Sequence, residues 1–153
     1  MSQNQFQILF QDAFDTFKVF HAITQSETGC AIPKAPKTIW QILNHLIAWQ
    51  EYQLGLLHWV ESVILNEEST WIIQLKTDSQ DELEKAVLKF DSQIQQIKNE
   101  VINLNSADLL IFTKLKVLQD LSVHLSFHIG EIILMRRMMG TYPLPQEMKE
   151  FLK

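Results

Sequence analysis

Two histidines stand four residues apart near the end of the chain, in the stretch HLSFHIGEIILMRR at 124–137. A helix turns about 100° per residue, so His124 and His128 would share one side of it, and Asp120 and Glu131 would extend the same polar row. The neighbouring positions are apolar, and ionisable groups beside an apolar face cost free energy unless they are paired or metal-bound. The spacing alone fits a metal site as well as it fits a surface stripe or hydrogen-bonded core histidines.

A catalytic metal ion usually takes three protein ligands and keeps one open position, so a third histidine would be needed. The remaining candidates are His21, His45 and His58. His45 lies at the edge of an apolar stripe in ILNHLIAW, from which a second helix could bring it towards the pair. We expect His21 and His58 to be surface or structural residues. Neutral imidazoles from two facing helices would form a three-histidine site with room for water or substrate.

Four further residues are candidates for the surroundings of such a site. Glu131 could be a fourth ligand, a general base or a hydrogen-bonded helix residue, and we favour a position outside the ligand sphere. Asp120 could accept a hydrogen bond from the second nitrogen of the first paired histidine, or it could face water. Trp49 and Tyr52 follow His45 on the same side of its helix and are expected to wall a pocket.

Helices are expected to position these residues. Apolar residues at intervals of three and four predict helices over about 3–26, 38–65, 79–103 and 113–139. Thr38 with Gln41, and Ser79 with Glu82, have the form of capping boxes at the starts of the second and third helices. Gly140 suits the position just after the last helix.

The connections complete the predicted architecture. Prolines make 32–36 a linker that is not helical, 71–75 is expected to be extended or a single turn, and the tail 141–153 a short ordered extension. The chain therefore is expected to form one all-α domain, 1–153, folded as a four-helix bundle with a long connection between the second and third helices.

Composition excludes several classes of function. The formal net charge of −5 and the lack of a basic patch argue against nucleic-acid binding. No apolar stretch reaches the roughly 20 residues of a membrane span, and the N-terminal sequence is unlike a signal peptide. The single cysteine, Cys30, allows no intramolecular disulfide, which fits a cytoplasmic protein.

The same stretches resemble a known family. HLSFHIGEIILMRRMMG is similar to the last-helix signature of the DinB-like (YfiT-like) metalloenzymes, in which H-x-x-x-H-x-G-Q-I is followed by apolar residues, an arginine pair and glycine. TIWQILNHLIAW resembles their second-helix segment, where a tryptophan precedes a histidine. The order of elements agrees over nearly the whole chain. One position departs from the pattern, because Glu131 stands where the family usually has glutamine.

The resemblance implies a four-helix bundle that holds a divalent metal ion, nickel or zinc, through His45, His124 and His128. It also implies a homodimer and a reaction on a small-molecule substrate, with a low-molecular-weight thiol as co-substrate in the thiol S-transferases of the family. The family name DinB is associated with DNA damage, but this association does not imply that the protein binds DNA.

Three functions compete at this level. The first is a metal-dependent enzyme, a thiol S-transferase or a hydrolase, in which the metal activates a thiolate or water. The second is a non-catalytic binding or stress-response bundle that dimerises through its methionine-rich end. The third is a small-ligand carrier with a pocket beside Trp49 and Tyr52. We place the enzyme first.

Overall fold

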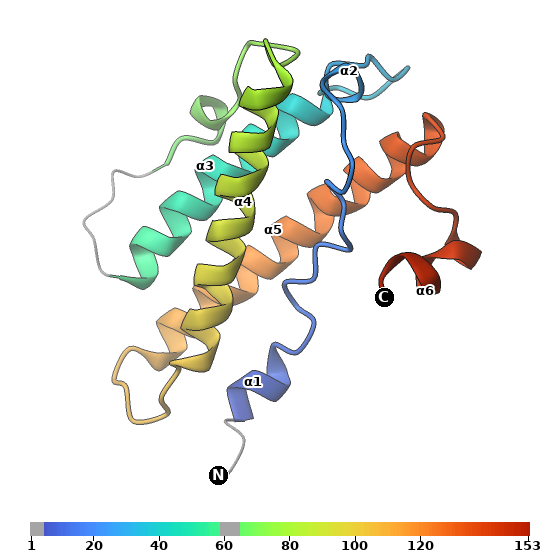
Figure 1. Ribbon diagram of the computed structural model, residues 1–153. Coiled ribbons are helices and arrows are strands. Elements are labelled where there is room, and N and C mark those ends of the chain that lie inside the picture. The colour runs from blue at the N-terminus through green and yellow to red at the C-terminus, as the bar shows by residue number, and fades with distance from the viewer. Residues whose placement is uncertain (1–4, 59–64) are drawn as a thin grey trace.

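The computed structural model describes residues 5–58 and 65–153, and in these ranges the chain forms helices and turns but no strand. The long helices α3, α4 and α5 span Ile39–Leu57, Gln80–Ile102 and Ile111–Met138 (Figure 1). The short helices α1, α2, η1, η2 and α6 span Gln5–Leu9, Gln25–Thr28, Glu67–Thr70, Pro145–Glu147 and Met148–Phe151. The predicted all-α fold class is therefore confirmed.

Helix α3 packs against both of the other long helices. It contacts both α4 and α5 (Figure 1), and residues on almost all of its sides are buried. Apolar residues make up most of its surface, but Gln41, His45, Gln50 and Gln53 are buried with them. Burying such groups costs free energy unless they are hydrogen-bonded, and Gln41 and His45 do find partners within the protein.

The predicted cap of α3 is confirmed and that of α4 is half formed. Thr38 and Gln41 each bond the other's backbone N–H, as a capping box requires. The Ser79 hydroxyl accepts from the Glu82 N–H at 3.0 Å, but the Glu82 carboxylate turns away to the Thr77 hydroxyl. The prediction of a reciprocal box at Ser79 is wrong because Thr77 competes for the carboxylate.

Helix α5 ends just before Gly140, as the sequence predicts. Gly140 has a φ of +73°, the left-handed conformation in which a side chain is disfavoured. The N–H groups of Thr141 and Gly140 donate to the carbonyls of Arg136 and Arg137, at 2.9 and 3.0 Å. These are the two bonds of a Schellman motif, and they turn the chain back along the helix.

The other predicted boundaries agree in part with the structure. Helices α4 and α5 match the predicted third and fourth helices within two residues at each end. Helix α3 ends at Leu57, and the predicted continuation over 59–64 lies outside the described residues. The 71–75 stretch is not helical, and the tail forms η2 and α6, as expected.

The predicted long first helix is wrong. Only Gln5–Leu9 and Gln25–Thr28 are helical, and turns connect them. The segment nevertheless buries four apolar residues in the common core. They belong to the expected apolar stripe or lie next to it, and they are Phe14, Val19, Phe20 and Ile23. In Figure 1 it runs lengthwise beside the long helices, and the Phe20 ring meets Phe90 of α4 edge-on at 5.1 Å.

Backbone conformation and tertiary hydrogen bonds explain why this segment is not helical. Asp12, Phe17, Lys18 and Ala22 have φ values between 50° and 61°, which no right-handed helix contains. The Phe17 carbonyl accepts from the Tyr142 hydroxyl rather than from a helical N–H four residues on. Apolar spacing alone does not record this competition for backbone carbonyls.

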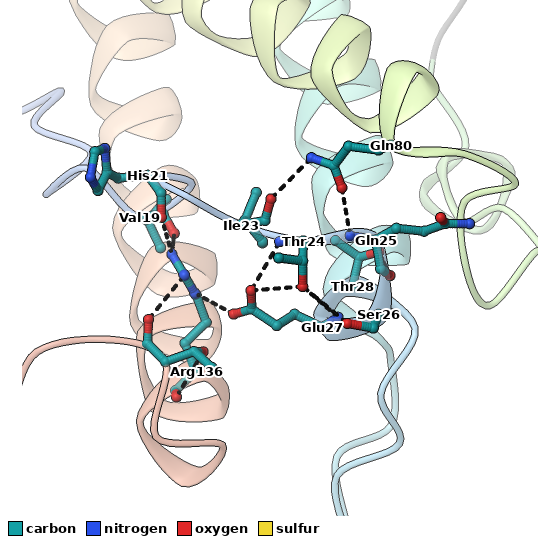
Figure 2. A network of polar contacts seen from close by, with 11 residues as sticks. Val19, His21, Ile23, Thr24, Gln25, Ser26, Glu27, Thr28, Gln80 and Arg136 are labelled. Atoms are coloured by element: carbon teal, nitrogen blue, oxygen red, sulfur yellow. Dashed lines mark hydrogen bonds and ion pairs between the residues drawn. The ribbon is translucent and has the colours of Figure 1, made fainter.

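A buried arginine takes two more carbonyls of the segment (Figure 2). Arg136 of α5 is 2% exposed, and it donates to the carbonyls of Val19 and His21 at 2.6 and 3.1 Å. It also donates to the Glu27 carboxylate at 3.1 Å and to the Thr141 carbonyl at 3.0 Å. One guanidinium thus joins the N-terminal segment, α2 and the C-terminal turn to α5, and its charge is neutralised by Glu27.

The balance of effects on Glu27 makes this pair sensitive to acid. Burial raises the pKa of Glu27, but hydrogen bonds from Thr141 and Thr24 and the charge of Arg136 outweigh burial and leave that pKa below 4.5. A carboxyl group whose pKa is lower in the folded chain stabilises it fully above pH 4.5. That contribution is lost as the pH falls below 4.5 through the folded-state pKa.

We predict that Glu27→Gln lowers the free energy of unfolding at pH 7 by about 2 kcal/mol, because the buried guanidinium loses its counter-charge. The difference from the unaltered protein should shrink as the pH falls from 4.5, and urea unfolding at a series of pH values measures it. Glu150→Gln is the matched control, since Glu150 forms an exposed pair with Lys153 that should contribute little. A difference that stays constant with pH would contradict the prediction.

None of the helices in the described ranges has the length and apolarity that a membrane crossing requires.

Candidate metal centre

His45 approaches the centre from α3 and is held by the connection that follows that helix. Its side chain is 1% exposed, and Nδ1 lies 2.6 Å from the Thr70 hydroxyl oxygen. Because Thr70 donates its own proton to the Glu67 carbonyl at 2.5 Å, the hydroxyl must accept from Nδ1–H. This fixes the tautomer of the neutral imidazole and leaves the Nε2 lone pair free.

His124 and His128 approach from α5, one turn apart as the spacing predicts. Nδ1 of His128 lies 2.6 Å from a carboxylate oxygen of Glu131, which can accept a hydrogen bond from Nδ1–H. In the neutral ring this again leaves Nε2 as the free nitrogen. Glu131 therefore contacts His128 from outside the three-histidine cluster, which is the position that the sequence favours for it.

The structure brings His45, His124 and His128 together. One nitrogen from each lies within 4.8 Å of the others, and Nε2 of His45 is 3.0 Å from Nε2 of His124. Two imidazole nitrogens bound to one zinc ion at about 2.0–2.1 Å lie roughly 2.9–3.4 Å apart, for angles between 90° and tetrahedral. The His45–His124 pair has this spacing, and the three donors together could hold a divalent ion of the kind that prefers imidazole nitrogen.

The electrostatics of the cluster favour metal over protons. Burial, together with the charges that His124, His128 and Lys37 can carry, lowers the pKa of His45 to about 3. Burial and the neighbouring His128 lower the pKa of His124 to about 4. Both imidazoles therefore stay neutral near pH 7 and keep a lone pair for a ligand.

Aromatic rings hold the cluster from two sides. Trp71 stacks on His45 with ring centres 3.8 Å apart and planes 4° from parallel. Trp49 lies on another side, 6.3 Å from His45 and 5.3 Å from His124, and Tyr52 packs behind Trp49 at 5.9 Å. These contacts leave the imidazoles little freedom to rotate away from one another.

The other candidate residues lie elsewhere. Asp120 accepts from Lys116 on the preceding turn of α5 and no hydrogen bond joins it to His124, so of its two alternatives the acceptor role towards His124 is not seen. His58 pairs with Glu100 at 2.8 Å, and His21 packs against Phe151. Both histidines are outside the cluster, as the sequence indicates.

The centre opens on a cleft of about 1070 Å³ between α5 and the 32–37 loop, which is the segment IPKAPK. His124, His128 and Glu131 line this cleft, and Trp71 forms part of it. His45 is not among the lining residues and closes the cluster from the side of the core. An ion on the three nitrogens would be reached from this cleft.

Sequence reasoning missed Thr70 and Trp71. Both lie in the long connection between α3 and α4, where no periodic pattern relates them to a helix. A hydroxyl that fixes a histidine tautomer has no sequence signature, because the contact spans 25 residues. The length of the connection was the one available signal, because long connections between helices often have a functional role.

Comparisons of the chain with protein-family models, with curated proteins and with solved structures gave no significant match.

We predict that Thr70→Val weakens metal binding about 10- to 100-fold, because His45 loses the acceptor that fixes its tautomer. Competition with a chromophoric chelator measures the affinity. Ser69→Ala is the matched control, because the neighbouring Ser69 hydroxyl is exposed and bonds only the Asn66 carbonyl. Equal affinities of Thr70→Val and the unaltered protein would show that the hydroxyl has no such role.

Proposed function

We propose that this protein is a metal-dependent enzyme that binds a divalent ion through His45, His124 and His128. The observation that carries the proposal is that three imidazoles, two of them oriented by hydrogen bonds, converge at the inner end of a large cleft. Three protein ligands with an accessible side are typical of catalytic rather than structural sites.

A divalent ion bound there would lower the pKa of a bound thiol or water and so supply a nucleophile at neutral pH. The protein's own residues would hold the metal ligands and orient the substrate. Thr70 and Glu131 hold two of the imidazoles, Trp71 covers one face of His45, and the cleft walls would orient the substrate. With its carboxylate engaged by His128, Glu131 is a positioning residue in this proposal.

Within this class we propose a thiol S-transferase of the DinB-like type, with nickel or zinc as the metal. The support is the resemblance of the two histidine segments, together with the order of α3, α4 and α5 and the proline-bearing linker before them. The N-terminal segment differs from the long first helix that a four-helix bundle of this family implies. A homodimer and a cytoplasmic location stay predictions from the sequence.

Metal analysis of protein purified without a histidine tag or added metal tests the centre. We expect about one divalent ion per chain, lost in His45→Ala, His124→Ala and His128→Ala. His21→Ala and His58→Ala are matched controls and should retain it, because neither residue joins the cluster. A metal-free native protein, or uptake that the three variants leave unchanged, would remove the proposal.

The same preparation, loaded with cobalt(II), tests the transferase assignment. Adding 2-mercaptoethanol should produce a thiolate-to-cobalt absorption band, because the open side of the ion faces the cleft. A cobalt spectrum that thiols do not alter would contradict thiol activation, and water would then be the nucleophile to test.

A further inference from the structure

One wall of the cleft is an apolar row that is open to water. The α5 apolar stripe, defined here as Val123, Phe127, Leu134 and Met138, lines the cleft, and each member is 59–65% exposed. Spacings of four, seven and four residues keep the row on one side of the helix. A contiguous exposed apolar surface on a folded domain marks a binding site.

The opposite wall is short and stiff. All six residues of the 32–37 loop line the cleft, and Pro33 and Pro36 restrict its backbone. A wall that is already ordered costs less entropy when a ligand binds against it. The space between the two walls has the size of cavities that enclose small organic ligands.

The loop also brings positive charge close to the histidines. The Lys37 ammonium lies 4.9 Å above the Trp71 ring, and Trp71 stacks directly on His45, so one indole separates the ammonium from the imidazole. Lys34 lines the same wall. Among the described residues neither lysine pairs with a carboxylate, whereas several other lysines do.

The acidic residues of the cleft do not pair with these two lysines. Asp120 pairs with Lys116, and Glu131 accepts a hydrogen bond from His128. Glu67 is exposed and forms no ion pair among the described residues. Lys34 and Lys37 are therefore the two lysines of the cleft that no carboxylate pairs with among the described residues, and an anionic ligand could pair with them.

We propose that the cleft binds an organic anion with an apolar body, whose acidic group pairs with Lys37 and whose body lies on the α5 apolar stripe. This orientation places the middle of the molecule against His124 and His128. The catalytic part of this inference rests on the proposed function, because it takes the organic anion as the electrophilic substrate of that enzyme. The binding of an apolar anion can be tested separately from metal chemistry.

A matched pair of fluorescent probes tests the role of charge. 8-Anilinonaphthalene-1-sulfonate and N-phenyl-1-naphthylamine share one aromatic body, and only the first carries an anionic group. On the zinc-loaded full chain, Lys37→Gln should raise the Kd of the sulfonate about tenfold and leave that of the neutral probe within about twofold. Lys37→Arg should restore sulfonate binding, and Lys149→Gln, on the distant α6, should change neither probe.

A second pair of variants tests the apolar wall. Phe127→Ser should weaken both probes severalfold, because it removes apolar contact from each alike. Phe112→Ser is the matched control, since Phe112 is another exposed α5 phenylalanine and lies outside this cleft. Equal losses in the two serine variants would overturn the placement of the ligand.

Three further results would overturn the proposal. They are unchanged sulfonate binding in Lys37→Gln, an equal loss of both probes in that variant, and a sedimentation-defined dimer that binds neither probe because a second copy covers the stripe. Repeating the titrations after removing zinc separates the two proposals. The difference between the probes should persist without metal. A failed metal assay would therefore leave the anion-binding proposal intact, and a failed probe assay would leave the metal-centre proposal intact.

Discussion

The burial of the Arg136 guanidinium constrains more of this fold than any other single interaction. A buried cation must be fully hydrogen-bonded and neutralised, and Arg136 obtains its partners from the N-terminal segment, from α2 and from the turn after α5. The N-terminal segment lacks regular helical hydrogen bonds, yet it contributes Phe14, Val19 and Phe20 to the core. Arg136, the Tyr142 hydroxyl and apolar burial together therefore hold this segment in place.

The same helix carries the histidine pair, and fixing α5 against α3 is what completes the cluster. His45 is buried in the most enclosed helix, where an imidazole is stable only if it is neutral and hydrogen-bonded. Thr70 supplies that bond from the connection to α4, and Glu131 does the same for His128. Each of these two bonds also points a free Nε2 at the centre, so the contacts that make the histidines tolerable in the core also prepare them as ligands.

The surroundings of the centre are asymmetric. Towards the core, His45 is enclosed by Trp71 and Trp49, whereas His124 and His128 face a cleft with one apolar and one cationic wall. A bound ion would be rigidly held from one side and accessible from the other. Structural metal sites, in which protein ligands surround the ion, lack such an accessible side.

The sequence by itself determined the three long helices, the cap at Thr38, the end at Gly140 and the pairing of His124 with His128, because all of these depend on contacts within a few residues. It also favoured His45, since an apolar stripe indicates which side of a helix faces the core. Only the tertiary structure decided that the phenylalanine-rich N-terminal segment is not a helix, because Arg136 and Tyr142 take its carbonyls from more than a hundred residues away. Only the tertiary structure brought Thr70 and Trp71 to His45, since a long connection has no periodicity that fixes where its side chains fall.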